Sequence, residues 1–334
     1  MVTLEQVLRA TSRTFAIGIE ALPNPLREEM RIAYLVLRVS DYLEDNTTLE
    51  ASTKASLLDA WAETLRGAEP AEALLDHLGS TEDPSPDSLA AHHALEILRA
   101  LEELPSQAQE RIRAHTRDST LGMARWVRRG PDIQNEGDLD DYMHEVAGRV
   151  GYLITDLFFL YTDAIRAPHP EMMTLGREFG LALQTVNVVR GIPSDVQRGW
   201  FFVPRDFLTE SIRSGRDFLR EEHREEAMAV VDRLLAKASR HFQAAERYVL
   251  LLPRFQGKLR LFCLLPLFFG VRTVALSRGN SEVVRSEVKL GRGEVRKIAR
   301  RTRLWAWSDG WIRRYVRALD RRQRHPPARN SPAK

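Results

Sequence analysis

Cysteine and targeting signals are scarce in this 334-residue chain, whose only cysteine is Cys263. A single cysteine excludes an intramolecular disulfide and fits a reducing cytoplasm. The first residues lack the basic stretch and the apolar run of a signal peptide. The most apolar segment, residues 261–271, is too short to cross a bilayer, so we expect a core helix there. These absences predict a cytoplasmic protein.

Strand patterns are also missing, because no segment alternates apolar and polar residues between turn signals. Apolar residues instead recur at spacings of three and four along most of the chain. A hydrophobic content of 43% is ordinary for a globular protein. The sequence therefore predicts an all-α fold of about ten helices in one domain over residues 1–315. We expect residues 316–334 to form a disordered basic tail.

Charge is distributed unevenly, since Arg285 and the residues after it carry 16 Lys and Arg against 4 Asp and Glu. A basic region of this kind suits nucleic acid, anionic lipid or diphosphate, or is simply solvated. No zinc-finger, RRM or KH pattern accompanies it, so we expect no nucleic-acid partner. The cluster of Trp305, Trp307 and Trp311 fits a membrane interface or the packing of a terminal helix.

Three carboxylates stand close together within a predicted apolar helix, at Asp41, Glu44 and Asp45. Spacings of three and four place them on one helix face, where like charges repel. Mg²⁺ would relieve that repulsion, because it binds one or two carboxylates together with water and phosphate. Arg38, one turn earlier, would add a cation for phosphate. The alternative is a solvated acidic patch at a helix end.

Further polar residues occupy helical positions that a purely structural helix would not need. Gln184, Asn187 and Arg190 follow one another at three-residue spacing, and Asp195 comes shortly after them. Tyr142 opens a segment, residues 142–151, whose small residues permit close helix packing.

Five blocks of sequence occur together and in order. They are SRTF at residues 12–15, YLVLRVSDYLED at 34–45, YMHEVAGRVG at 142–151, QTVNVVR at 184–190 and a glycine-to-proline segment at 199–204. This order resembles the squalene/phytoene synthase family of head-to-head prenyltransferases. Segments 261–266 and 288–293 are similar to its squalene synthase branch. The resemblance extends from about residue 11 to about residue 298, and it implies the helical bundle of the class I isoprenoid (terpenoid) synthases.

The resemblance implies a Mg²⁺-assisted ionisation of prenyl diphosphates, with farnesyl diphosphate as the expected substrate, and NADPH as the reductant of a squalene-forming member. It assigns a role near the carbocation to Tyr142. Metal ligation falls to Asp41, Glu44, Asp45 and Asp195. The residues expected around the diphosphate are Ser12, Phe15, Arg38, Gln184, Asn187 and Arg190.

The second acidic motif departs from the family pattern, because Gly191 and Ser194 stand where the family has carboxylates and only Asp195 remains. Pro193 lacks an N–H, so we expect a kink or an end of the helix there. Trp200 replaces an arginine that is usual in the family, while Lys289 and Arg292 are kept in the segment that resembles an NADPH-associated loop. Asp156 is a candidate substitute acid, provided that its helix is continuous from Tyr142.

Three functions fit these features. The first is a squalene-synthase-like transferase that forms presqualene diphosphate or squalene. The second is a terpene cyclase or prenyltransferase that ionises one diphosphate, and the third is a non-catalytic isoprenoid-binding protein. The lipophilic substrate and the basic C-terminal region fit peripheral attachment to a membrane. Nothing in the sequence indicates an oligomeric state.

Overall fold

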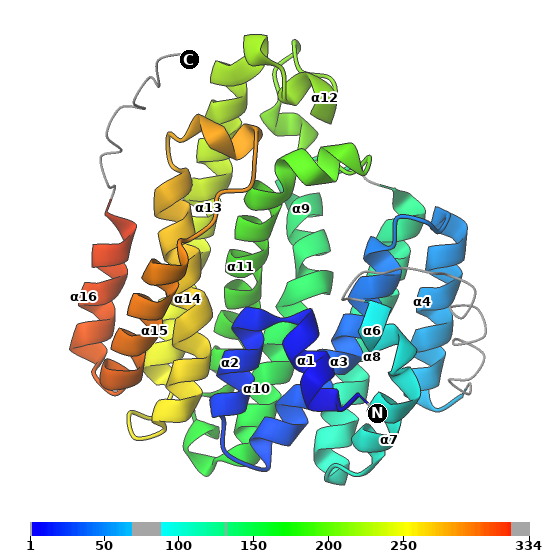
Figure 1. Ribbon diagram of the computed structural model, residues 1–334, viewed down its shortest axis with the longest axis vertical. Coiled ribbons are helices and arrows are strands. Elements are labelled where there is room, and N and C mark those ends of the chain that lie inside the picture. Colours follow the sequence, from blue (N-terminus) through cyan, green and yellow to red (C-terminus); the bar gives the residue numbers. More distant parts are fainter. Residues whose placement is uncertain (1, 69–87, 131, 322–334) are drawn as a thin grey trace.

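The protein is a bundle of helices, as the computed structural model shows over residues 2–68, 88–130 and 132–321 (Figure 1). Within these ranges the structure contains no strand, and its one isolated β-bridge joins Asp132 to Phe201. The predicted all-α class is confirmed over these residues. The described residues contain more helices than the expected ten, several of them only one or two turns long.

The helices follow one another along the chain with these bounds: α1 Leu4–Thr11, α2 Arg13–Ala21, α3 Leu26–Asp45, α4 Ala51–Arg66, α6 Ser88–His92, α7 Ala94–Glu102, α8 Ser106–Arg129, α9 Glu136–Met143, η1 His144–Gly148 (a π-helix), α10 Arg149–Tyr161, α11 His169–Gln197, α12 Gly215–Phe218, α13 Arg224–Leu251, α14 Gly257–Ser277, α15 Arg292–Trp305 and α16 Asp309–Asp320.

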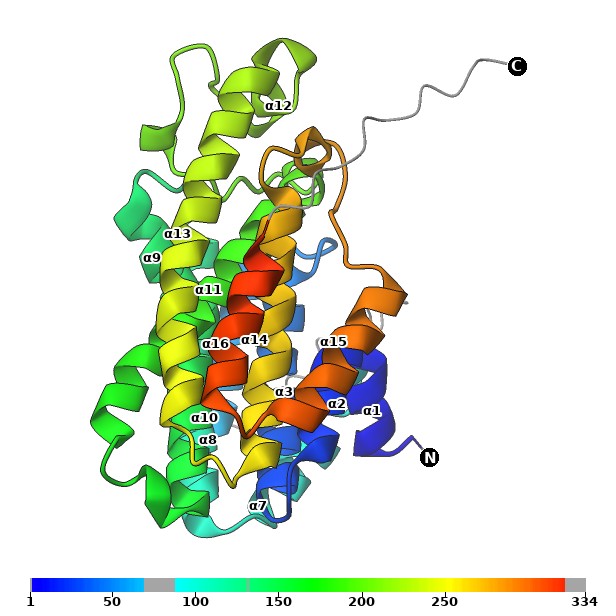
Figure 2. The same cartoon turned by 90° about the vertical axis from the view of Figure 1, so that its left-hand side faces the viewer.

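The middle of the bundle is formed by α9, α10 and α11, with α4 and α8 on one side and α13 to α16 on the other (Figure 1). Turned by a quarter, the molecule shows α11, α13 and α14 running side by side (Figure 2). The segment 142–151 packs closely on α11, as its small residues predict. A Cβ at Gly180 would lie 2.2 Å from the Ala147 carbonyl oxygen, so only glycine permits this approach.

Helix α11 carries the second acidic segment, and it does not end at Gly191 or Pro193. The helix continues to Gln197 with Pro193 inside it, so the prediction that it ends there is wrong. Val189 and Ile192 are both buried, and their packing holds the helix in place on either side of the missing hydrogen bond. The chain reverses only at Gly199, whose φ of 82° is one that glycine adopts without strain.

Helix α14 is the one described helix long and apolar enough to cross a membrane by length and composition. Because 78% of its apolar window is buried within the bundle, it has the character of the core helix that the sequence predicts. Cys263 is buried in it. At the C-terminus, α16 extends past the predicted boundary at residue 316, and Leu319 packs in the core. The rest of the predicted tail, residues 322–334, lies outside the described residues.

Candidate active site

The predicted first acidic motif lies in the last turns of α3, where Tyr34, Arg38, Asp41 and Asp45 follow one another at spacings of four, three and four. This spacing places them along one helix face. The Arg38 Nη1 donates to the Asp41 Oδ2 over 3.0 Å. Asp41 is half-buried and Asp45 is exposed, so solvent reaches both carboxylates.

The N-terminal segment 12–15 lies against this same face of α3. Ser12 caps α2, its hydroxyl accepting from the Phe15 backbone N–H over 3.1 Å. The Phe15 and Tyr34 rings lie 6.3 Å apart between centroids. Burial raises the pKa of the Tyr34 hydroxyl, while Arg38 and hydrogen bonds with Thr11 and Ser12 oppose that rise. The structure therefore places Ser12 and Phe15 beside Tyr34, which shares its helix face with Arg38 and Asp41.

Asp45 and Asp195 come from different helices and are joined through one arginine. The Arg198 Nη1 lies 3.2 Å from the Asp45 Oδ1, and its Nη2 lies 2.5 Å from the Asp195 Oδ1. Burial raises the pKa of Asp195, which Arg198 opposes and Asp45 reinforces. Asp195 thus points toward the first motif and not away from it, because α11 keeps its helical course past Pro193.

Glu44 differs from its two neighbours on α3 because it is buried, with 8% of its surface exposed. Burial raises the pKa of its carboxyl well above the usual range, and Asp45 and Asp41 add to the shift. The neutral form that this favours is a poor ligand for a cation. A hydrogen bond joins Glu44 to Tyr142, whereas its Oε1 has no partner among the described residues.

Tyr142 lies beneath the acidic cluster and is buried by aromatic rings. Its ring stacks on Phe202 at 4.6 Å and meets Trp126 edge to face at 5.8 Å. Trp200, which replaces the expected arginine, stacks on Phe202 in turn. Burial and the charges of Glu44, Asp45, Asp195 and Asp41 raise the pKa of the Tyr142 hydroxyl well above its usual range. It therefore remains protonated and able to donate a hydrogen bond.

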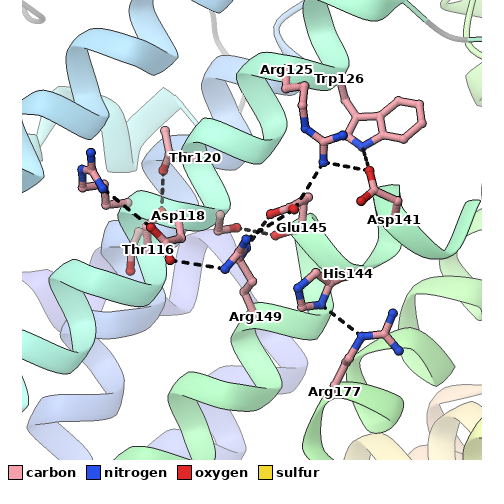
Figure 3. A network of polar contacts seen from close by, with 12 residues as sticks. Thr116, Asp118, Thr120, Arg125, Trp126, Asp141, His144, Glu145, Arg149 and Arg177 are labelled. Carbon is pink, nitrogen blue, oxygen red and sulfur yellow. Dashed lines mark hydrogen bonds and ion pairs between the residues drawn. The ribbon is translucent and has the colours of Figure 1, made fainter. Parts of the chain in front are cut away.

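A polar network holds the segment around Tyr142 in place (Figure 3). Glu145, on the π-helix η1, accepts from Arg125 of α8 over 3.3 Å and also pairs with Arg149. Asp141 accepts from Arg125 over 2.7 Å and from the Trp126 indole N–H over 2.9 Å. Since Asp141 and Trp126 both adjoin Tyr142, the network fixes the tyrosine ring against α8.

The predicted diphosphate residues on α11 lie together on one face. The Asn187 Nδ2 donates to the Gln184 Oε1 over 3.1 Å. Arg190 pairs with Glu287, which also pairs with Lys289 over 2.5 Å. The loop predicted to resemble an NADPH-associated segment is therefore tied to α11. Among the described residues, Arg190 pairs with Glu287 and not with the carboxylates of α3.

Asp156 is not a substitute acid for the second motif. It accepts from the Nε2 atoms of His115 and His169 at 2.8 Å each. Although its burial acts to raise the pKa of Asp156, these hydrogen bonds leave that pKa lowered. Its two partners hold the carboxylate in a pairing away from Tyr142, and this corrects the prediction.

The carboxylates fit only part of the predicted metal set. Among the described residues, no three Asp, Glu, His or Cys side chains converge in a geometry that holds a metal ion. Asp41 and Asp45 pair with Arg38 and Arg198 but remain accessible to solvent, and they would supply the one or two carboxylates that Mg²⁺ needs when water and phosphate complete its shell. Glu44 and Asp195 are buried, so neither is accessible to the ion in this way. The four-carboxylate set predicted from the sequence is therefore not assembled.

Sequence reasoning missed three residues of this site. Tyr34 shares the helical face of Arg38 and Asp41, a spacing that the sequence displays. Lys54 is buried and donates from its Nζ to the Glu44 backbone oxygen over 3.0 Å. Arg198 lies 153 positions from Asp45, and no local pattern indicates their contact.

Residues 8–294 match the sequence profile of the squalene/phytoene synthase family. Squalene synthase 1 of Arabidopsis thaliana is 28% identical over 311 residues, which cover 90% of this chain and 70% of that protein. The squalene synthase of Solanum lycopersicum is 27% identical with the same coverage.

Solved structures share the fold. A ligand complex of TcSQS superposes with a TM-score of 0.82 at 24% identity and covers 97% of this chain and 92% of its own. Squalene synthase HpnC of Alicyclobacillus acidocaldarius gives 0.57 at 21% identity, over 85% of this chain and 94% of its own.

Proposed function

The chain belongs to the squalene/phytoene synthase family of prenyltransferases, and we propose that it joins two farnesyl diphosphates head to head to form presqualene diphosphate. The reaction releases one diphosphate and one proton as the new carbon–carbon bonds form. The observation that carries the proposal is the convergence of Asp41 and Asp45 with the buried Tyr142 and the basic residues Arg38 and Arg198.

Each of these groups suits one requirement of the reaction. Mg²⁺ on Asp41 and Asp45 would neutralise the departing diphosphate. Arg38 is half-buried beside Asp41 and supplies N–H donors to phosphate oxygens. Tyr142, with its stack on Phe202, presents aromatic faces that stabilise a nearby carbocation. The buried rings around it exclude the water that would quench such a cation.

The test is to incubate the purified protein with farnesyl diphosphate and Mg²⁺, with and without NADPH, and to identify the extracted products. We expect presqualene diphosphate without NADPH. Squalene in the presence of NADPH would extend the proposal to the reductive step. A cyclised terpene or a prenylated acceptor would show that one diphosphate is ionised and overturn the head-to-head proposal, as would binding without turnover.

We further propose that the protein works at the cytoplasmic face of an anionic membrane. A groove of about 810 Å³ lies between α2, α14 and α15, and its lining includes Leu261 and Leu265 beside Lys258, Arg300 and Arg303. Exposed apolar side chains of the same region are Ile17, Phe255, Leu304, Trp305 and Trp307. Aromatic residues set among basic ones favour the boundary between headgroups and acyl chains.

Sedimentation with vesicles tests this surface. We expect binding to vesicles of phosphatidylcholine with phosphatidylserine and much weaker binding to phosphatidylcholine alone. A Phe255→Ala/Trp307→Ala variant should lose the binding, whereas Arg205→Ala, on another part of the surface, should keep it. Equal sedimentation of the wild type and the double variant would overturn the proposal.

A further inference from the structure

Arg198 occupies the position between the two acidic segments, at the carboxyl end of α11. Its Nη1 and Nη2 bind Asp45 and Asp195 at 3.2 and 2.5 Å. A guanidinium has five N–H donors in a planar fork, so two hydrogen bonds leave others free. The Arg198 side chain is 36% exposed. The remaining donors are therefore accessible to an anion from the solvent side.

Gly191 makes this arrangement of Asp195 possible. A Cβ at position 191 would lie 2.6 Å from the Asp195 Oδ2, closer than real Cβ atoms approach. The Asp195 carboxylate thus folds back over the turn that precedes it and fills the space that a side chain at 191 would need. Gly191, Asp195 and Arg198 therefore depend on one another: without a side chain at position 191, the Asp195 carboxylate can occupy the space in which it binds Arg198.

A divalent cation does not fit this end of the site while Arg198 is in place. The guanidinium is always charged, and its repulsion of a metal ion would act at contact distance from the only carboxylate of the second segment. Lys54 adds a second cation nearby, since its charge and that of Arg198 affect each other. Arg198 and Lys54 therefore provide positive charge at the end of α11 without a metal ion.

We propose that Arg198 replaces the metal ion of the second acidic motif: it joins Asp45 to Asp195 and binds a diphosphate through its free N–H donors. The site then combines the acidic face of α3, which extends back to Asp41, with one fixed guanidinium at the end of α11. The inference rests on the proposed function for the identity of the anion, a prenyl diphosphate. The anion-binding chemistry itself is tested with inorganic pyrophosphate.

Two binding measurements on the full-length protein test the proposal without turnover. In Arg198→Ala, calorimetry should show pyrophosphate affinity weakened by about tenfold or more, because charge-assisted hydrogen bonds are lost. Titration of Mn²⁺ followed by electron paramagnetic resonance should show tighter metal binding in the same variant, since Asp45 and Asp195 lose their cation. Arg205→Ala, whose side chain is exposed and pairs with Asp132, is the matched control and should change neither affinity.

A second, more conservative variant separates loss of the charge from misfolding of Arg198→Ala. Arg198→Gln keeps N–H donors and much of the bulk but removes the charge, and it should shift both affinities in the same directions. Unchanged pyrophosphate affinity, or Mn²⁺ binding that weakens, in a folded variant would overturn the proposal. The proposed function fails separately: absence of turnover in the wild type would refute it, while the two binding shifts would still support the role of Arg198.

Discussion

The end of α3 and the end of α11 face each other through Arg198, yet they offer different chemistry. On α3, Asp41 and Asp45 stand one turn apart, accessible to solvent and paired with Arg38 and Arg198. On α11, Asp195 stands alone, is buried to 8% exposure and is held by Arg198. The first end suits a divalent cation, whereas the second already contains a cation of the chain.

This difference teaches that acidic sequence alone does not make a metal site. Glu44 lies within one turn of Asp41 and Asp45 on α3, but burial raises its pKa and favours its neutral form. Asp156 is acidic and close in sequence to the site, but two histidines bind it. In each case the partners contributed by other helices decide what the carboxylate can do.

The largest expected effect on turnover comes from removing a carboxylate at the end of α3. Asp41→Asn should lower turnover of farnesyl diphosphate by about 10³-fold, the equivalent of the several kcal/mol that a metal ion supplies to a leaving group. The measurement is the initial rate with saturating Mg²⁺. Asp59→Asn, an exposed carboxylate of α4 paired with Arg128, is the control and should retain the wild-type rate. Wild-type turnover in Asp41→Asn would remove the metal role from α3.

Restoring the family pattern on α11 should harm the protein instead of improving it. In Gly191→Asp/Ser194→Glu the new Cβ at 191 displaces the Asp195 carboxylate, and we expect a loss of about 1–3 kcal/mol in the free energy of unfolding. Turnover should fall by about tenfold, because Arg198 loses the Asp195 carboxylate that holds it in position. Ser194→Glu alone changes an exposed position and serves as the control. A rise in turnover of the double variant would contradict the proposal that Arg198 takes the place of a metal ion at the end of α11.

Tyr142 lies near the ends of both α3 and α11. We expect removal of its hydroxyl to lower turnover less than the variants on α3. Tyr142→Phe keeps the stack on Phe202 but leaves the buried Glu44 without its hydrogen bond. We expect kcat to fall by about tenfold and the free energy of unfolding by about 1 kcal/mol. Steady-state kinetics and urea unfolding measure the two effects. Tyr161→Phe, outside the site on α10, should leave kcat unchanged, and an unchanged kcat in Tyr142→Phe would confine that residue to packing.

The smallest effect on turnover is expected at Asp156, because its role is structural. Asp156→Asn should leave kcat within about twofold and cost about 2 kcal/mol of stability, since the charge is lost and the amide keeps an acceptor oxygen for only one of the two histidines. The pKa of Asp156 is lowered from 3.8, so its stabilisation is present above that pH and is lost as the pH falls toward the lowered value. Urea unfolding at neutral pH and below pH 3.8 should show the difference between wild type and variant shrinking in acid. A large loss of turnover with stability intact would return Asp156 to the site.

The helical class and one face of the site could be predicted from the sequence. Periodicity places Arg38, Asp41 and Asp45 along a single helix, and these residues lie within 12 positions of Tyr34. The helix end predicted at Pro193 is wrong, because α11 continues to Gln197 with buried neighbours on either side of the proline. Local spacing therefore predicts which residues share a helix face, whereas packing against other helices decides where a helix ends.

The sequence by itself determined the helices, the open acidic face of α3 and the order of blocks that identifies the family, because each depends on neighbours within a few turns. Only the tertiary structure decided that Glu44 is buried, that two histidines bind Asp156 and that Arg198 joins Asp45 to Asp195. Those outcomes depend on charges brought together from helices up to 153 positions apart, and electrostatic interaction follows distance in space.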